Sequence, residues 1–141
     1  MPTVTSADGT TIAYETVGAG PALILVDGAL CYRGQGPSRD LAAALADTYT
    51  VYCYDRRGRG DSGDTPPWSA DREIEDLAAL LAAAGGTAYL FGASSGAVLA
   101  ADAAARNTSA PPDETPWTYT GPSPPASAIT AVRSSISRST A

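Results

Sequence analysis

A serine flanked by glycines has the spacing of a catalytic nucleophile. The segment Gly-Ala-Ser-Ser-Gly over residues 92–96 follows the apolar run AYLF and precedes the alanine-rich run AVLAADAAA. A strand–turn–helix setting of this kind lifts the serine hydroxyl above the end of the strand, where it can attack a carbonyl carbon. Gly92 and Gly96 suit a turn that is too sharp to leave room for β-carbons. The chemistry that this pattern predicts for Ser94 is acyl transfer.

The general base that such a serine needs is not evident in this chain. The 141 residues contain no histidine, and a serine hydroxyl without an adjacent base is a poor nucleophile at neutral pH. Stabilisation of the oxyanion alone leaves only slow residual catalysis. We therefore expect negligible hydrolysis by this chain alone.

The elements that would position Ser94 follow one another in a regular alternation. Strand signals alternate with amphipathic helix signals over the first hundred residues, which predicts a parallel sheet covered by helices on both faces. An Asp-Gly dipeptide between two strand signals near the N-terminus predicts a hairpin. The predicted strands after the hairpin cover residues 22–26, 50–55 and 87–92; the predicted helices cover 39–47, capped by Ser38, 71–84, capped by Ser69, and 97–106.

Several segments together resemble the N-terminal half of the α/β-hydrolase fold family, over about residues 3–107. LILVDGAL resembles the family's strand and oxyanion loop, YDRRGRGDSG resembles its Asp-x-Arg-Gly-x-Gly-x-Ser segment, and LFGASSGAVLA resembles its nucleophile elbow. The resemblance implies a partial α/β-hydrolase fold, a mostly parallel sheet flanked by helices with an N-terminal hairpin. In the family, the acid and the histidine of the triad follow later strands, and this chain has neither segment.

The resemblance also assigns roles to individual residues. Ser94 would be the nucleophile, and the backbone N–H groups of Ser95 and Ala29 would be the two oxyanion donors. Gly28 would allow close approach in the oxyanion loop. Asp27 stands where the family often has a histidine with a structural role.

The arginines that follow the second buried strand predict no nucleic-acid site. Arg56, Arg57 and Arg59 are offset by acidic residues of the same loop, so we expect a solvated loop with internal ion pairs. The net charge of −6 also disfavours a phosphate backbone as a partner. The offsetting acids are Asp55, Asp61 and Asp64.

Glycines of the same loop superficially fit a dinucleotide-binding fingerprint. Gly58, Gly60 and Gly63 have the spacing, but the following helix begins only past Pro67 rather than at those glycines. We therefore expect neither a cofactor nor a metal, and a small molecule as the substrate or ligand.

The composition changes sharply after Asn107. Of the residues 108–141, more than half are serine, threonine or proline, with no apolar period. We expect one α/β-hydrolase-like unit over 1–107 and a tail that is disordered or the product of out-of-frame translation. No signal peptide or membrane span is evident, and two cysteines form no disulfide framework, so we expect a cytoplasmic protein.

The strand that leads to Ser94 would be a sheet edge if the rest of the family's fold were missing. An apolar, uncharged edge pairs readily with other chains, so we expect self-association through the strand near Tyr89–Phe91. The sequence favours a serine hydrolase acting on an ester or related acyl bond, truncated and without its triad histidine and acid. Two alternatives stay open: a non-catalytic module that binds a small molecule, and one half of a two-chain enzyme completed by a partner.

Overall fold

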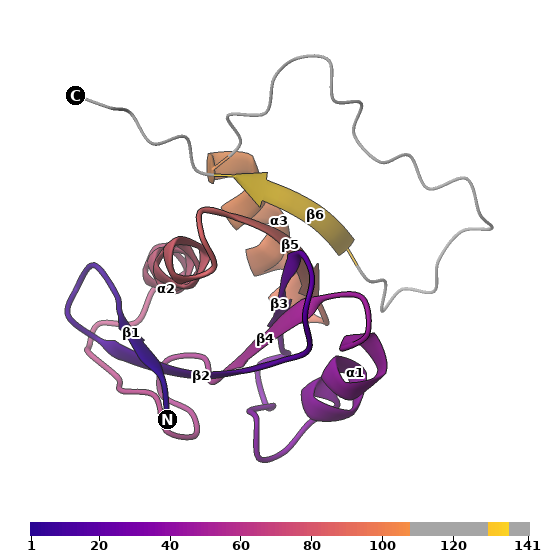
Figure 1. Ribbon diagram of the computed structural model, residues 1–141. Helices are drawn as coiled ribbons and strands as arrows, with labels where there is room; N and C mark the ends of the chain where they lie inside the picture. The colour runs from indigo at the N-terminus through magenta and orange to yellow at the C-terminus, as the bar shows by residue number, and fades with distance from the viewer. Residues whose placement is uncertain (108–129, 136–141) are drawn as a thin grey trace.

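In the computed structural model, the described part of the chain, residues 1–107 and 130–135, forms six strands and three helices (Figure 1). The alternation predicted from the sequence is confirmed, since strands and helices follow one another from β3 to α3. The elements are β1 (Thr3–Thr5), β2 (Thr11–Val17), β3 (Ala22–Val26), α1 (Ser38–Leu45), β4 (Thr50–Tyr54), α2 (Ala70–Ala83), β5 (Thr87–Gly92), α3 (Ser95–Asn107) and β6 (Thr130–Ser135).

The strands form one mixed sheet in the order β1-β2-β4-β3-β5-β6. The central strands β4, β3 and β5 are parallel, whereas β1, β2 and β6 pair antiparallel with their neighbours. The chain moves from β3 to β4 on one side and then crosses over β3 to β5 on the other side. Helices of successive crossovers therefore lie on opposite faces: α1 covers one face, and α2 and α3 cover the other (Figure 1).

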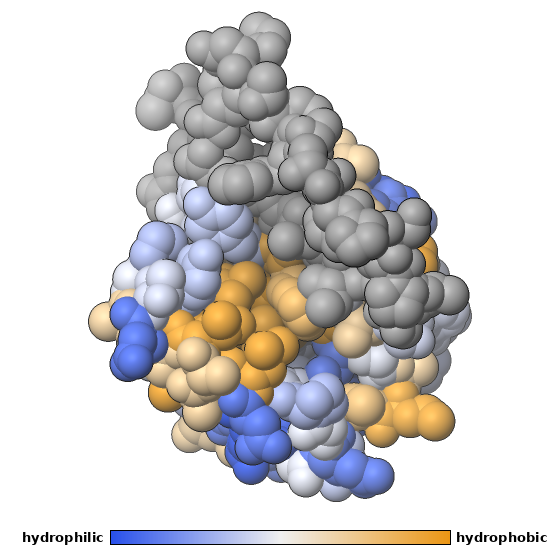
Figure 2. Space-filling model, turned by 90° about the vertical axis from the view of Figure 1, so that its right-hand side faces the viewer, coloured by the Kyte–Doolittle hydropathy of each residue, from blue (hydrophilic) through white to orange (hydrophobic). Residues whose placement is uncertain are grey.

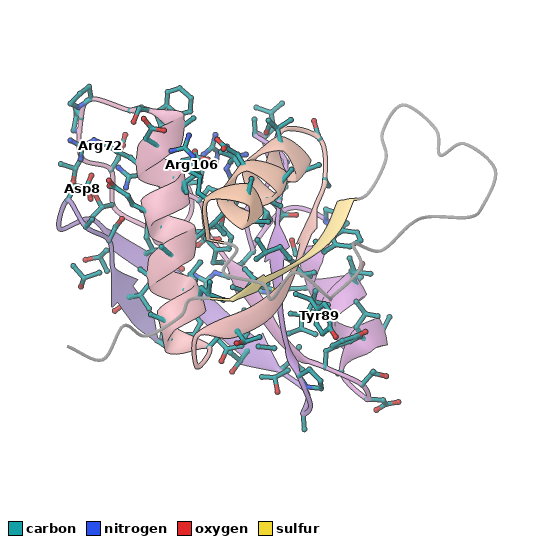
Figure 3. The ribbon with its side chains drawn as sticks, turned by 90° about the horizontal axis from the view of Figure 1, so that it is seen from above. Asp8, Arg72, Tyr89 and Arg106 are labelled. Carbon is teal, nitrogen blue, oxygen red and sulfur yellow. The ribbon has the colours of Figure 1, made fainter. Side chains whose placement is uncertain are left out.

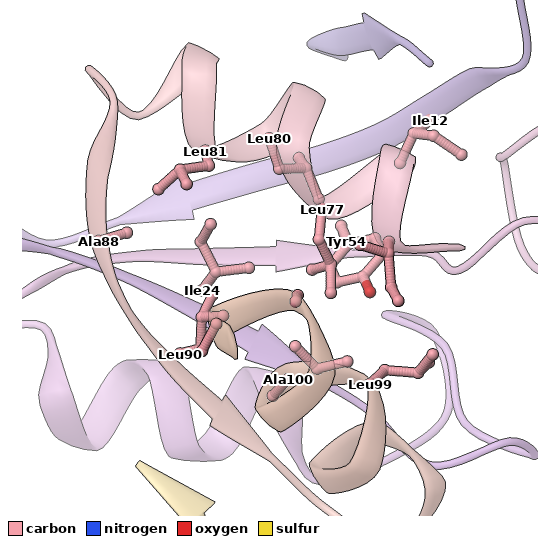
Figure 4. Packing of buried hydrophobic residues seen from close by; sticks show 14 residues of the cluster. Ile12, Ile24, Tyr54, Leu77, Leu80, Leu81, Ala88, Leu90, Leu99 and Ala100 are labelled. Atoms are coloured by element: carbon pink, nitrogen blue, oxygen red, sulfur yellow. The ribbon is translucent and has the colours of Figure 1, made fainter. Parts of the chain in front are cut away.

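The wholly apolar sequence of β3 follows from burial on both faces of the sheet. Ile24 and Val26 belong to the larger core cluster, under α2 and α3, whereas Leu23 and Leu25 belong to a smaller cluster under α1. Alternate residues of a strand point to opposite faces, so a strand between two helical layers needs an apolar residue at every position. Figure 4 shows the larger cluster, where Ile24 and Leu90 of the sheet lie opposite side chains of α2 and α3.

The face of the sheet that α1 covers is less completely buried. Tyr89 and Phe91 of β5 pack against the smaller cluster but stay partly exposed. Tyr89 points toward α1 (Figure 3) and makes an edge-to-face contact with Tyr49, with ring centroids 5.8 Å apart. Figure 2, which looks onto the right-hand side of Figure 1, shows apolar surface on this side of the molecule.

The starts of two helices test the predicted caps. Ser69 caps α2 as predicted, because its hydroxyl accepts a hydrogen bond from the backbone N–H of Arg72 at 3.3 Å. The prediction for Ser38 is wrong. Pro37 occupies the cap position of α1, and Ser38 is the first helical residue, with its hydroxyl donating to the buried carboxylate of Asp27 instead.

The outer edge of β5 differs from the expectation of an open sheet edge. β6 pairs antiparallel with β5 over the whole strand, from Thr87 opposite Ser135 to Gly92 opposite Thr130. Six residues of the segment expected to be disordered therefore form a strand, and the rest of that segment, 108–129 and 136–141, lies outside the described residues. None of the helices in the described ranges is long and apolar enough to cross a membrane.

Candidate functional site

Three loops meet at one end of the sheet, where the parallel strands β4, β3 and β5 all have their carboxyl ends. The loop after β3 carries Asp27–Leu30, the loop after β4 carries Asp55–Thr65, and the turn after β5 carries Ser94. The direction of the crossovers reverses at β3, and ligand sites of open α/β sheets form at such a switch point. The three sequence segments that carry the family resemblance thus converge on one place.

Ser94 lies in the turn between β5 and α3 with a left-handed backbone. Its φ of 54° is the only positive φ of a residue other than glycine in the described ranges, and the residue is exposed. A non-glycine residue in this region costs on the order of 1–3 kcal/mol and needs a surrounding structure that enforces it. The enforcing contacts are backbone hydrogen bonds from Ala93 to Val26, at 3.0 Å, and from Gly96 to Ala93, at 2.9 Å.

The two glycines of the turn are required by close backbone approach, as the sequence predicts. A β-carbon on Gly92 would overlap the backbone of Gly96 and Ala97, and one on Gly96 would overlap the carbonyl groups of Val26 and Asp27. The turn therefore sits directly against the end of β3. This contact brings Ser94 next to the loop that follows β3.

The predicted oxyanion donors lie in the two segments that flank Ser94. Ser95 is the first residue of α3, so its N–H belongs to the open end of a helix whose dipole favours negative charge. Within the described residues, neither the N–H of Ser95 nor that of Ala29 donates to a protein acceptor. A β-carbon on Gly28 would lie 3.5 Å from Cβ of Ser94, so the two segments are in van der Waals reach.

The expectation of a solvated arginine loop is wrong for Arg56 and Arg57. Both side chains are buried, with 4% and 2% of their surface exposed, and both pair with acids of α2 rather than with acids of their own loop. A buried guanidinium is tolerated when it is paired and fully hydrogen-bonded. Arg56 binds Glu73 through Nε at 2.9 Å and Nη2 at 2.5 Å.

Sequence reasoning missed the contacts of Arg56 with the site itself. Nη1 of Arg56 donates to the backbone oxygen of Asp27 at 3.1 Å and to Oγ of Ser95 at 2.9 Å. The available signal was the spacing of the acids Glu73 and Asp76, which are three residues apart and so share one face of α2. The carboxylates on that buried face need cationic partners, and the nearest two consecutive arginines in the sequence are Arg56 and Arg57.

A second buried network joins Arg57 to the N-terminal hairpin. Arg57 pairs with Asp76 and, through Nη1 at 2.8 Å, with Asp8 in the turn between β1 and β2. Arg72 of α2 pairs with the same carboxylate, and Figure 3 shows Asp8 and Arg72 together at one end of α2. The guanidinium of Arg57 holds the pKa of Asp8 well below its usual value. This network fixes α2 over the sheet.

Asp55 organises the loop after β4. Its carboxylate accepts hydrogen bonds from the backbone N–H of Arg33 at 2.8 Å, from Nη2 of Arg33 at 2.9 Å and from the N–H of Asp61 at 2.9 Å. Burial alone would raise the pKa of Asp55, but these bonds to the charged form outweigh burial and lower it. Gly60 adopts a φ of 53° beside this carboxylate, where a β-carbon would overlap it.

Asp27, the first residue of the loop after β3, is buried, 5% exposed, and accepts the hydrogen bond from the hydroxyl of Ser38. Burial raises the pKa of its carboxyl group, against the opposing effects of Ser38 and Arg56. Burial also raises the pKa of the neighbouring Cys53 thiol to about 12. In the parts of the chain that the structure describes, no group of three or more acidic, cysteine or histidine side chains could hold a metal ion.

Comparison with known proteins agrees with the family resemblance seen in the sequence. Residues 18–141 match the sequence profile of the "Alpha/beta hydrolase family". An uncharacterized hydrolase, YraK of Bacillus subtilis (strain 168), is 36% identical over 106 residues, which are 70% of this chain and 37% of that protein. The chain therefore spans well under half the length of this curated relative.

Solved structures resemble the fold over a similar stretch. An alpha/beta hydrolase from Sphaerobacter thermophilus DSM 20745 is 59% identical with a TM-score of 0.71, covering 74% of this chain and 40% of that one. An esterase from Rhodococcus sp. ECU1013 is 32% identical with a TM-score of 0.66 and the same coverage. An esterase from Thermogutta terrifontis is 30% identical with a TM-score of 0.65, again with that coverage.

Proposed function

This chain belongs to the alpha/beta hydrolase family, and from that premise we propose that it carries the nucleophile and oxyanion part of a serine hydrolase site. The proposed substrate is a small molecule with an ester or related acyl bond. Ser94 is the nucleophile, and the backbone N–H groups of Ser95 and Ala29 bind the oxyanion. The observation that carries this proposal is the exposed, left-handed Ser94 beside two segments whose backbone N–H groups, at Ser95 and Ala29, donate to no acceptor within the described residues.

The proposed reaction proceeds through an acyl-serine. Oγ of Ser94 attacks the carbonyl carbon while a base accepts the hydroxyl proton, and the carbonyl π electrons move onto the oxygen. The negative charge on that oxygen develops near the N–H groups of Ser95 and Ala29, which need no reorganisation because neither gives up an acceptor in the described part of the chain. Collapse of the tetrahedral intermediate breaks the bond to the leaving alcohol, which takes up the proton. Water then hydrolyses the acyl-serine by the same steps.

The base for this reaction comes from outside the 141 residues, because the sequence contains no histidine. It would be supplied by further residues of a longer protein or by a partner chain, which retains the two-chain enzyme as a variant of the proposal. Without that base, the 141 residues bind the acyl compound and leave it intact. The absence of histidine thus also favours the second candidate function, a non-catalytic module that binds a small molecule.

Labelling with a fluorophosphonate probe tests the proposal. The full chain is treated with the probe with and without imidazole as an added base, and the labelled serine is identified by peptide mass spectrometry. We expect slow labelling of Ser94 that imidazole accelerates, and no turnover of p-nitrophenyl acetate above that of Ser94→Ala. Ser94→Ala is the matched control, because it keeps the backbone and removes only the hydroxyl.

Two results would contradict the proposal. Labelling spread over many serines would mean that Ser94 has no special reactivity. Turnover by the unaided chain, lost in Ser94→Ala, would instead show that a base is present within the 141 residues, which overturns only the proposed incompleteness.

A further inference from the structure

Among the hydrogen bonds of the described residues, Arg56 is the one side chain that binds both segments carrying the proposed oxyanion donors. Its Nη1 atom donates to the backbone oxygen of Asp27, in the loop after β3, and to Oγ of Ser95, at the start of α3. Both acceptors are next to the reacting groups but are not among them. Ala29 lies two residues beyond Asp27, and the oxyanion donor of the turn is the N–H of Ser95 itself.

We propose that Arg56 is a positioning residue, which holds the two halves of the oxyanion site at a fixed separation. This inference rests on the proposed function, because it concerns how the same donors are kept in place. Arg56 does not touch the reacting atoms. It acts through the carbonyl group of Asp27 and the hydroxyl of Ser95.

The anchoring of Arg56 supports this role. Nε and Nη2 bind Oε2 of Glu73, which is only 1% exposed and lies on α2, and Oε1 of Glu73 accepts from Nε1 of Trp68 at 3.0 Å. The ion pair with Glu73 therefore fixes the orientation of the guanidinium plane, and Nη1 is left to bind the two segments of the site. A planar fork with donors on three nitrogens joins three elements at once, which a lysine ammonium does not reproduce.

A neighbouring arginine, Arg59, also holds the loop after β3 that carries the proposed donor of Ala29. Nε of Arg59 donates to the backbone oxygen of Ala29 at 2.5 Å, and the N–H of Cys31 donates to the oxygen of Gly28 at 3.2 Å. The N–H of Ala29 belongs to the Gly28–Ala29 peptide, and in a trans peptide it points away from the carbonyl that Cys31 binds. The peptide that carries this donor is thus held by Cys31 within the loop after β3, and the next peptide is held by Arg59 from the loop after β4.

The mildest test removes the hydroxyl of Ser95, because Ser95→Ala leaves the pair of Arg56 with Glu73 intact. In the ¹⁵N-enriched full chain, without the fluorophosphonate probe, we expect increased ¹⁵N relaxation dispersion at the amides of Gly28 and Ala29, although the substitution is in another segment. Ser95→Thr retains the hydroxyl and should restore the wild-type behaviour. This measurement needs no reaction at Ser94, so it decides the positioning role even if the proposed function fails.

The second test measures the rate of fluorophosphonate labelling of Ser94 in the presence of imidazole. Loss of one positioning hydrogen bond should slow labelling about fivefold in Ser95→Ala, and Arg56→Lys should slow it further. Arg39→Lys is the matched control, since Arg39 is exposed, pairs with Glu15 and lies outside the site. We expect its labelling rate to stay at the wild-type value.

The outcomes separate the two proposals. Unchanged dispersion at Gly28 and Ala29 in Ser95→Ala, together with a wild-type labelling rate, overturns the positioning role and leaves the proposed function intact. Absence of labelling at Ser94 in the wild-type chain overturns the proposed function, whereas the dispersion measurement still decides the role of Arg56. Circular dichroism of each variant shows whether the fold is retained, and Ser95→Ala keeps the test decisive if Arg56→Lys unfolds.

Discussion

Arg57 and Asp76 form a buried two-point ion pair, with Nε 2.8 Å from Oδ2 and Nη2 2.6 Å from Oδ1 of the carboxylate. Both side chains are almost fully buried, and the pair joins the loop after β4 to α2. Pairing with Asp76 also raises the pKa of Arg57, so the guanidinium stays charged inside the protein. Removal of the Asp76 carboxylate breaks the two-point pair and leaves the buried guanidinium of Arg57 with one remaining acid partner, Asp8.

We therefore predict that Asp76→Asn lowers the free energy of unfolding by about 3–5 kcal/mol, as in other broken buried pairs. Asp71→Asn is the matched control on the same helix. Its pair with Arg106 is exposed, so it should cost at most about 1 kcal/mol. Urea denaturation of both variants measures the difference, and equal losses would contradict the importance of burial for this pair.

The left-handed backbone of Ser94 predicts that glycine is tolerated there better than any other residue. Ser94→Gly should raise the free energy of unfolding by up to about 1 kcal/mol, because glycine adopts a φ of 54° without a β-carbon clash. Ser94→Ala removes the hydroxyl but keeps the strain, so its stability should equal that of the wild type. Thermal melts compare the three proteins, and a Ser94→Gly variant that is less stable than Ser94→Ala would contradict the strain.

The contact between the turn and β3 predicts stability losses of different size for substitution of two glycines of the site. Gly96→Ala should cost about 3 kcal/mol, because the new methyl group would lie 2.7 Å from the carbonyl carbon of Val26. Gly28→Ala should cost less than about 1 kcal/mol, because its nearest neighbour would be Cβ of Ser94 at 3.5 Å. Urea midpoints of the two variants test this difference. Similar losses in both would show that the turn does not press on β3.

The pH dependence of stability should differ in sign between two buried aspartates. The pKa of Asp55 is lowered in the folded state, so its contribution is present above the usual 3.8 and is lost as the pH falls below it. The loss in unfolding free energy caused by Asp55→Asn should be largest at pH 7 and should shrink below pH 4, as measured by urea denaturation.

The pKa of Asp27 is raised by burial, so the contribution of its carboxyl group to stability is full below pH 3.8 and is lost as the pH rises. The loss in unfolding free energy caused by Asp27→Asn, relative to the wild type, should therefore be smaller at pH 7 than at pH 4, as measured by urea denaturation.

The two cysteines should differ sharply in reactivity. Cys53 is 1% exposed and its thiol has a pKa of about 12, so almost no thiolate is present at pH 8. Cys31 is partly exposed in the loop after β3. Ellman's reagent at pH 8 should label one thiol in the folded chain and two in urea. Fast labelling of two thiols without urea would contradict the burial of Cys53.

The sequence predicted the elements of the fold well because local patterns determine them. Apolar runs marked β3, β4 and β5, and Ser69 marked the start of α2. The role of Ser38 was mispredicted because its hydroxyl has a partner, Asp27, that lies eleven residues earlier in the chain. Capping rules consider only neighbours along the helix, so they do not contain this competing hydrogen bond.

The site was predictable in part for the same reason. The turn around Ser94 is a local motif, with glycines required at two fixed positions. The burial of Arg56 and Arg57 depends on acids of α2, a separate element, and their charge alone suggested exposure. Pairing across elements decides whether a charged residue is buried, and composition of one loop does not contain that information.

The pairing of β5 with β6 has a consequence for the order of folding. In this pairing Gly92 meets Thr130 and Thr87 meets Ser135. β6 is the edge strand of the described sheet and pairs with β5 alone, whereas β5 is also held by β3, so β6 is expected to dock once β5 is already in place. The chain then passes through a state in which the strand leading to Ser94 has one side open. Contacts between chains made in that interval compete with β6, and the speed of docking decides which pairing the strand receives.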